Sequence, residues 1–300
     1  MNILSLENIT HSYTERKLFD NTSFYLHEGE KVGVIGINGT GKSTLLKIMA
    51  GVEVPDEGEV IKASNMMIHY LPQNPRFNDE DTVLESVQNM IHHHANENEL
   101  VKAKSMMTRL GITDFEQKTG ELSGGQRKRL ALVSVLITPC DILILDEPTN
   151  HLDSEMAQWL ENQLKAFKGA LVMVTHDRYF LDSVTNRIIE LDKGKIYSYD
   201  EKYSGFLQRK AEREDSVKAS ERKRQSILRK EIEWMQRGAR ARSTKQKAHI
   251  KRYEDLKDQK GIETEDKIEL SSIKSRMGKT TIELENICKA YGENVLIKDF

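Results

Sequence analysis

The sequence predicts an α/β fold with a mainly parallel sheet, followed by a long antiparallel pair of helices. Residues 32–35, 142–145 and 170–175 are short apolar runs separated by helical patterns. Such runs are typical of parallel strands that are covered by helices on both faces. From residue 203 onward, Lys, Arg, Glu and Gln dominate, with apolar residues at helical spacing near 228–235 and 250–256, which predicts the two helices.

Composition excludes several classes of protein. The chain has 300 residues, of which 31% are charged and 6% aromatic, and this is enough for one large or two moderate domains. No apolar run approaches the ~20 residues that a membrane-spanning helix needs. Residues 1–5 do not resemble a signal peptide, and Cys140 and Cys288 match no metal or redox spacing. We therefore expect a cytoplasmic protein.

Charge is distributed unevenly. The net charge is only -2, but residues 200–280 contain 23 Lys and Arg against 15 Asp and Glu. A basic segment beside an acidic body suggests an anionic partner. The segment between the two predicted helices is the most basic part, which favours nucleic acid over a merely solvated helix pair. The candidate contact residues are Arg237, Arg240, Arg242, Lys245 and Lys247.

An internal repeat closes the chain. Residues 282–296 match residues 4–18 at one constant offset, including a shared Glu-Asn-Ile and a shared tyrosine. A second domain that begins like the first predicts a longer protein with a tandem arrangement. The predicted organisation is a first domain at 1–200, a helical linker at 201–279 and the start of a second domain at 280–300.

A phosphate-binding loop follows the first apolar run. Residues 36–43 fit the pattern G-x-x-x-x-G-K-[ST] between a strand and a helix. In this pattern backbone N–H groups surround the phosphates, Lys42 reaches the β and γ phosphates, and the Ser43 hydroxyl binds Mg²⁺. The predicted nucleotide-binding residues of the loop are Gly36, Asn38, Gly39, Thr40, Gly41, Lys42, Ser43 and Thr44.

Polar residues at the ends of the later strands complete a candidate catalytic site. Asp146 ends the second apolar run and is predicted to hold Mg²⁺, while Glu147 follows as the general base for water. His176 comes after the third run, where ligands bind in open α/β sheets, although a lone histidine is more often structural.

Three weaker signals remain. A short turn with Ser123, Gly124 and Gly125 leads through Gln126 into a basic helix, which is suited to presenting N–H groups to an anion. Gln73 beside two prolines suggests only a loop by itself, and Tyr13 fits either core packing or a functional role. The run at 92–94 is three consecutive histidines that share no helix face, so a solvated surface is favoured over a metal site.

These motifs together resemble the ATPase domain of the ATP-binding cassette (ABC) family, over residues 1 to about 200. The resemblance implies a P-loop ATPase core with an antiparallel β subdomain and a helical subdomain, binding ATP and Mg²⁺. Residues 36–44 match the Walker A motif, residues 122–126 the signature, and residues 146–147 the Walker B and catalytic pair. The resemblance also places Gln73 in the metal-contacting Q-loop, His176 at the switch position and Tyr13 against the adenine.

Residues 146–153 and 175–182 narrow the resemblance to the ABC-F subfamily, and within it to Uup-type translation factors. The resemblance implies tandem ATPase domains, a two-helix linker reaching from the ribosomal E site toward P-site tRNA and rRNA, and a role in rescuing translation or in antibiotic resistance. The ATPase motifs alone do not exclude the motor subunit of a membrane transporter, although the tandem repeat and the basic linker argue against it. The basic linker also allows a DNA-associated ATPase.

The resemblance further implies that each nucleotide lies between the Walker A motif of one domain and the signature of another. We therefore expect residues 1–200 to form one half-site and Ser123, Gly124 and Gly125 to complete the site of a second ABC domain. The 300-residue chain should bind ATP but hydrolyse it weakly, unless two copies associate.

Overall fold

The computed structural model describes residues 1–13, 17–90, 97–236, 285–291 and 294–298, and the statements below concern these residues. The chain divides into two compact units, Met1–Lys218 and Ala219–Phe300. The first unit contains the predicted motifs and two sheets. The boundary at residue 200 stays a prediction, and the second predicted linker helix, the basic turn at 237–247 and the histidines at 92–94 lie outside the described residues.

The larger sheet has the order β5-β6-β7-β3-β8-β9. Its first five members pair in parallel, and β9 runs antiparallel to β8. The prediction of a mainly parallel α/β fold is therefore confirmed. The bounds are β3 (Lys31–Ile35), β5 (Ile68–Leu71), β6 (Ile142–Asp146), β7 (Ala170–Val174), β8 (Arg187–Asp192) and β9 (Lys195–Tyr199).

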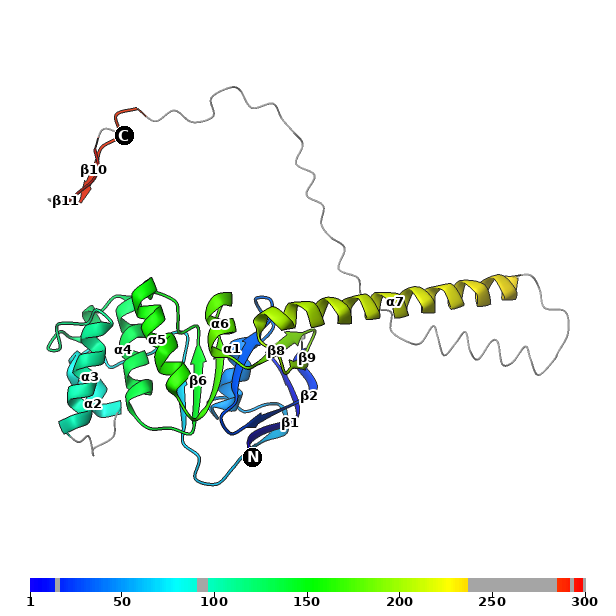
Figure 1. The fold of residues 1–300 in the computed structure, drawn as a ribbon, viewed down its shortest axis with the longest axis horizontal. Coiled ribbons are helices and arrows are strands. Elements are labelled where there is room, and N and C mark those ends of the chain that lie inside the picture. Colours follow the sequence, from blue (N-terminus) through cyan, green and yellow to red (C-terminus); the bar gives the residue numbers. More distant parts are fainter. Residues whose placement is uncertain (14–16, 91–96, 237–284, 292–293, 299–300) are drawn as a thin grey trace. The chain divides into compact units, whose positions relative to one another are not determined.

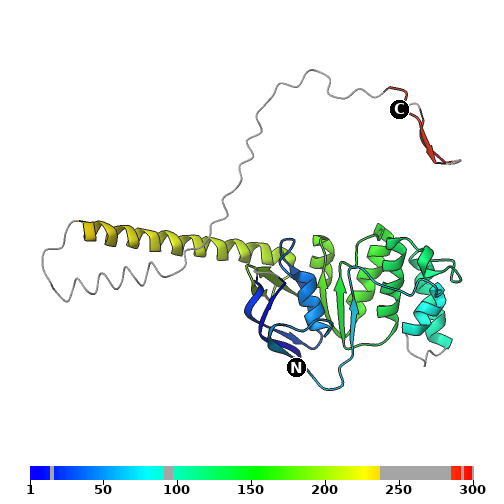
Figure 2. The ribbon, with the colours of Figure 1, turned by 180° about the vertical axis from the view of Figure 1, so that it is seen from behind.

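Helices cover both faces of this sheet, and β6 and β7 are accordingly buried along their whole length. Alternate residues of these strands contribute to two different core clusters, one with Leu143 and one with Ile144. Figures 1 and 2 show the sheet from its two sides, with α1 and α5 on opposite faces. The bounds are α1 (Lys42–Met49), α2 (Val83–Met90), α3 (Glu97–Arg109), α4 (Gly124–Ile137), α5 (Ser154–Ala166) and α6 (Arg178–Val184).

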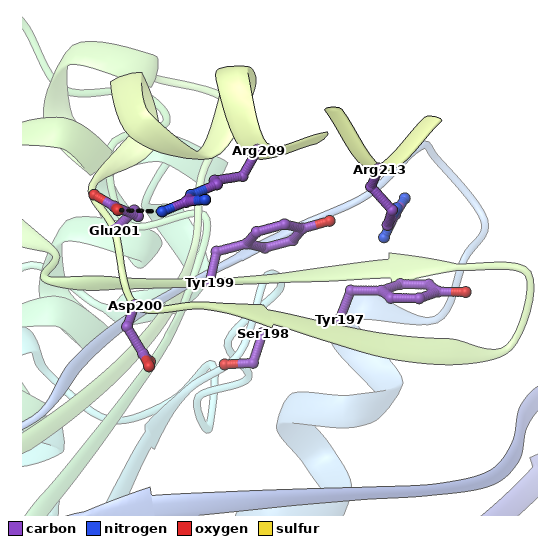
Figure 3. Close-up of a pocket in the computed structure, with 7 residues that line it drawn as sticks. All are labelled: Tyr197, Ser198, Tyr199, Asp200, Glu201, Arg209 and Arg213. Carbon is purple, nitrogen blue, oxygen red and sulfur yellow. Dashed lines mark ion pairs between the residues drawn. The ribbon is translucent and has the colours of Figure 1, made fainter. Parts of the chain in front are cut away.

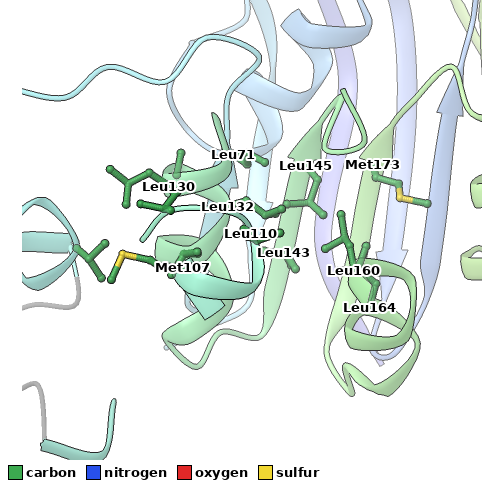
Figure 4. Close-up of a cluster of buried hydrophobic side chains, with 14 of the residues drawn as sticks. Leu71, Met107, Leu110, Leu130, Leu132, Leu143, Leu145, Leu160, Leu164 and Met173 are labelled. Carbon is green, nitrogen blue, oxygen red and sulfur yellow. The ribbon is translucent and has the colours of Figure 1, made fainter. Parts of the chain in front are cut away.

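The first cluster joins the helical subdomain to the sheet. Met107 and Leu110, from α3 and the turn after it, pack with Leu130 of α4 and with Leu145 of β6 (Figure 4). All four side chains are fully buried. Burial of a leucine-sized side chain contributes about 1.5–3 kcal/mol, so this cluster fixes α4, and with it the signature turn, against the strand that carries Asp146.

A separate antiparallel sheet has the order β2-β1-β4. Its members are β1 (Asn2–Ser12), β2 (Lys17–His27) and β4 (Glu57–Lys62). Apolar residues of β1 and β2 pack with α1 and with the inner face of β3, β6 and β7 in the second core cluster. The chain therefore has the antiparallel β subdomain, parallel core and helical subdomain that the sequence motifs imply.

The described residues of the second copy pair as their equivalents in the first copy do. In the second unit, β10 (Lys289–Tyr291) and β11 (Asn294–Ile297) form an antiparallel hairpin. Lys289 pairs with Ile297 there, at the positions equivalent to His11 and Phe19, which pair in β1 and β2. The equivalent Asn8 and Asn286 both have φ 53°. The hairpin thus repeats the strand register of the first domain's start.

Candidate nucleotide-binding and catalytic site

The phosphate-binding loop joins β3 to α1 and is shaped by its glycines. Gly41 caps α1 with φ 97°, a left-handed conformation that favours glycine. A Cβ atom at Gly41 would lie 3.1 Å from the Phe19 ring, so little room exists for a side chain. The Thr40 hydroxyl donates to the carbonyl of Ile37 at 2.9 Å, which closes the loop. The loop therefore presents its backbone at the N-terminus of α1, where an anion binds favourably.

Lys42 closes the loop from inside. Its ammonium donates to the carbonyl oxygens of Gly36 at 2.8 Å and Ile37 at 3.1 Å. Burial lowers the pKa of Lys42, and the nearby carboxylates of Glu147 and Asp146 act in the opposite direction. The Lys42 ammonium therefore already lies at the phosphate-binding loop, where phosphate oxygens could replace these carbonyl acceptors.

Asp146 has the character of a metal ligand. Its side chain is 1% exposed, and neither carboxylate oxygen accepts a hydrogen bond of ordinary geometry from the residues that the structure describes. Burial raises the pKa of Asp146, while the Ser43 hydroxyl and the ammonium groups of Lys128 and Lys42 act to lower it. A buried acceptor without a donor, beside a hydroxyl, fits a hard cation with oxygen ligands. The residues present therefore fit Mg²⁺, held by Asp146 and Ser43.

Glu147 is held in an unusual backbone conformation. Its φ is 53°, and its N–H donates to the carbonyl of Val174 at 2.8 Å. The carboxylate is buried, accepts from the N–H of His176 at 3.3 Å, and lies 3.4 Å from the His176 ring. A non-glycine residue in this region costs of order 1–3 kcal/mol and persists where the surroundings impose it, which is common at functional sites.

His176 joins the same end of the sheet as the two carboxylates. Its side chain is 67% exposed, so it does not belong to the core. The neighbouring Thr175 shares a 2.7 Å hydrogen bond with Thr149 and accepts from the N–H of Asp177 at 3.1 Å. These bonds fix the loop after β7 to the loop after β6, so His176 and Glu147 face one space.

Tyr13 is exposed rather than packed in the core. Its side chain is 59% exposed, and its hydroxyl donates to Glu53, which also accepts from His11 at 3.0 Å. The ring of His11 meets that of Tyr13 edge-on, with centroids 5.1 Å apart. Thr44 of α1 lies 3.5 Å from the Tyr13 hydroxyl, which places the ring beside the phosphate-binding loop. The exposure of Tyr13 contradicts core packing, and its functional role stays a prediction.

The signature turn is a regular helix start with an open surface. Ser123 caps α4 by accepting from the N–H of Gln126 at 3.2 Å, and the Gln126 side chain accepts from the N–H of Ser123 at 3.0 Å. Gly124 has no atom within 4 Å of an added Cβ, whereas at Gly125 that Cβ would lie 3.2 Å from His151. Ser123 and Gly124 are exposed, so the turn is available to a partner.

Gln73 is exposed in the loop after β5, and the ammonium of Lys128 donates to its carbonyl oxygen at 3.0 Å. No pattern in the sequence distinguishes Lys128, because it stands in one basic run with Arg127 and Arg129. In the structure Lys128 is 4% exposed. The sequence analysis also missed Glu53, because its partners His11 of β1 and Lys47 of α1 meet it only in the folded chain.

Parallel strands, a glycine-shaped loop and buried carboxylates define a P-loop nucleotide-binding domain. A family model described as ABC transporter matches residues 19–150, and a second with the same description matches residues 189–272. In the described residues no helix combines the length and apolar character required to cross a bilayer.

Curated relatives match the chain over nearly its whole length. The YfmR ABC transporter ATP-binding protein of Bacillus subtilis is 42% identical over all of this chain and 54% of its own length. The energy-dependent translational throttle protein EttA of Escherichia coli is 36% identical over 95% of this chain and 58% of its own. EttA of Mycobacterium tuberculosis is 33% identical over 99% of this chain and 60% of its own. The chain spans about half the length of the curated relatives that it matches.

Solved structures of ATP-binding cassette proteins are also similar to this chain. A dimeric ATP-binding cassette in a post-hydrolysis state, bound to ADP and Pi, is 27% identical, with a TM-score of 0.57 over 66% of this chain and 98% of that chain. RNase-L Inhibitor is 28% identical, with a TM-score of 0.55 over 65% of this chain and 39% of that chain. The protein belongs to the ABC family and, within it, to the ABC-F subfamily.

Proposed function

We propose that this chain is the ATP-binding first part of an ABC-F factor that acts on the ribosome to regulate or rescue translation. The observation that carries the proposal is the extent of similarity to EttA, a protein named as a translational throttle, over 95% of this chain. That similarity includes the residues after the ATPase motifs, which a transporter motor has no need to share. The alternatives are a transporter motor and a DNA-associated ATPase.

In this proposal the phosphates of ATP lie on the loop at Gly36–Thr44, within reach of Lys42, and the adenine stacks on Tyr13. Mg²⁺, when bound, neutralises phosphate charge and is held by Ser43, Asp146 and Gln73. Glu147 takes a proton from the attacking water, and His176, whose ring lies 3.4 Å from Glu147, contacts the γ-phosphate. Asp146 and Glu147 thus have separate tasks.

The exposed signature turn supports a partner domain. We propose that Ser123, Gly124, Gly125 and Gln126 contact nucleotide held by a second ABC domain, as the repeat at residues 282–296 suggests. The 300-residue chain should then hydrolyse ATP weakly, at a rate per molecule that rises with protein concentration as copies associate. Phosphate release measured over a hundredfold concentration range tests this, and a fast, concentration-independent rate would contradict it.

The basic face of α7 (Tyr203–Gln236) is the described part of the proposed ribosome contact. Arg222, Lys223, Arg229 and Lys230 are exposed on it. We propose that these residues contact rRNA or P-site tRNA, together with Arg237, Arg240, Arg242, Lys245 and Lys247, which follow in the sequence. Such contacts weaken steeply with salt, because binding releases counterions from the phosphates.

A competition among partners tests the function. The full-length protein is incubated with ATP and with ribosomes, tRNA, duplex DNA or lipid vesicles. The fraction of protein bound to each partner is measured at about 50 and about 200 mM salt. We expect salt-sensitive binding to ribosomes that exceeds binding to the other three. Preferential binding to DNA would favour the DNA-associated ATPase, and preferential binding to vesicles the transporter motor.

Tyr13→Ala should weaken ATP binding by about tenfold, because a ring stacked on a nucleobase contributes about 1–3 kcal/mol. A fluorescent ATP analogue measures the dissociation constant. Tyr13→Phe, which keeps the ring and loses the hydroxyl contacts with Glu53 and Thr44, serves as the control and should bind within about threefold of the parent. Equal affinity of the alanine variant and the parent would exclude the stacking role.

A further inference from the structure

Lys128 is a buried cation that lies between two parts of the proposed metal site. Its side chain projects from α4, the helix that begins at the signature turn, and is 4% exposed. The ammonium donates to the backbone carbonyl of Gln73 at 3.0 Å and to that of Asp146 at 2.8 Å. These two acceptors belong to the loop after β5 and to the end of β6, which are far apart in sequence.

The two acceptors are the backbone groups of the residues whose side chains are proposed to hold Mg²⁺. One ammonium therefore ties together the backbone of two proposed metal ligands. The carboxylate of Asp146 lies beside the Ser43 hydroxyl, but neither of its oxygens accepts a hydrogen bond of ordinary geometry among the described residues. Together with strand pairing, the bond from Lys128 holds the backbone from which this carboxylate projects.

A buried ammonium is expensive unless it is compensated. Burial lowers the pKa of Lys128, and the carboxylates of Asp146 and Glu147 oppose that effect. A neutral, apolar side chain would fill the same space without a desolvation cost, but it would leave both carbonyl groups without this donor. The buried charge of Lys128 is therefore best explained by the two backbone carbonyls that it holds in place.

We propose that Lys128 is a positioning residue for the metal site, which sets the distance between Gln73 and Asp146 and links both to the signature helix. The inference rests on the proposed function, in that it takes these residues as ligands of Mg²⁺. Residues that orient metal ligands from behind typically change metal affinity by 10–100-fold when they are replaced. Lys128 therefore controls metal binding more strongly than it controls nucleotide binding.

The test separates metal affinity from nucleotide affinity. Lys128→Met keeps roughly the length of the side chain but removes its charge and its N–H donors. Lys128→Arg keeps the charge and the donors. Arg129→Met is the matched control, because Arg129 is the next residue of α4 and, among the described residues, donates to the carbonyl of His151, at 3.3 Å, rather than to Gln73 or Asp146. Mn²⁺ replaces Mg²⁺ as an electron paramagnetic resonance probe, and a non-hydrolysable ATP analogue occupies the site.

We expect Lys128→Met to weaken Mn²⁺ binding by about tenfold or more, while metal-free binding of the analogue changes by less than about threefold. Lys128→Arg should recover part of the loss, and Arg129→Met should match the parent. Unchanged Mn²⁺ affinity in Lys128→Met, or equal losses of metal and nucleotide affinity, would overturn the inference. If Lys128→Met does not fold, a folded Lys128→Ala takes its place: weaker Mn²⁺ binding in Lys128→Ala than in Lys128→Arg supports the inference, and parental Mn²⁺ affinity in Lys128→Ala overturns it. A parent chain that binds no analogue would instead overturn the proposed ATP site.

Discussion

Replacing Glu147 by glutamine should slow ATP hydrolysis by roughly 10²–10⁴-fold and leave ATP binding intact. Glutamine keeps the size of the side chain and an oxygen that can accept from the N–H of His176, now 3.3 Å from the carboxylate. It cannot accept a proton from water, so only the chemical step is lost. Phosphate release and the binding of a fluorescent ATP analogue measure the two properties separately.

The control for this variant is Glu155→Gln. Glu155 is exposed in the first turn of α5 and lies outside the proposed site. The same change of charge there should leave hydrolysis within about twofold of the parent. Hydrolysis in Glu147→Gln at more than about a tenth of the parental rate would show that Glu147 is not the base.

The second large effect is expected at Glu190, which fixes the beginning of α7 to the sheet. Its carboxylate is 3% exposed and lies 2.6 Å from the ammonium of Lys210 and 2.9 Å from the guanidinium of Arg213. The hydroxyl of Tyr199 also donates to it, at 3.3 Å. The guanidinium of Arg213 lies 3.9 Å from the centroid of the Tyr197 ring. Figure 3 shows Arg213 of α7 above Tyr197 of β9.

Glu190→Ala should reduce the free energy of unfolding by roughly 3 kcal/mol, because it leaves two cations without their buried partner. This corresponds to a fall in Tm of about 6–12 °C for a domain of this size. Asp192→Asn is the control: Asp192 is 3.6 Å from Arg213 but 43% exposed, so its loss should matter little. Calorimetry measures both, and a melting temperature of Glu190→Ala close to that of Asp192→Asn would refute the role.

The position of Glu190 suggests why this contact matters for function. Glu190 pairs with Ile35, the last residue of β3, across the parallel ladder. The next residue, Leu191, has its carbonyl 2.8 Å from where a Cβ on Gly36 would lie. A single strand therefore contacts both the start of the phosphate-binding loop and the base of the proposed linker helix.

The strands and the phosphate-binding loop were predictable because their signals are local. The apolar runs at 142–145 and 170–175 identify buried strands, and the spacing of Gly36, Gly41 and Lys42 identifies the loop. Each depends on neighbours within about ten residues. The prediction of a long helix after residue 203 is confirmed for α7 for the same reason.

What the sequence did not reveal depends on contacts between distant segments. In the sequence, Lys128 resembles a surface charge, and its role becomes visible only where α4 packs against β5 and β6. Glu190 is a charged residue in an otherwise apolar strand, and its role becomes visible only where α7 packs over it. The exposure of Tyr13 follows from its partners Glu53 and His11, which no periodicity relates. Lys128 and Glu190 are charged groups in buried places, where only the assembled fold supplies the compensating charge or hydrogen-bond partner.

Retention on ribosomes by Glu147→Gln tests the central claim most directly, which is that ATP held at this site controls association with the ribosome. The protein as encoded in full, parent and variant, is sedimented with ribosomes in ATP and in ADP. We predict that the variant in ATP is retained about tenfold more than the parent, and that this excess disappears in ADP. Equal retention of variant and parent in ATP would contradict the account.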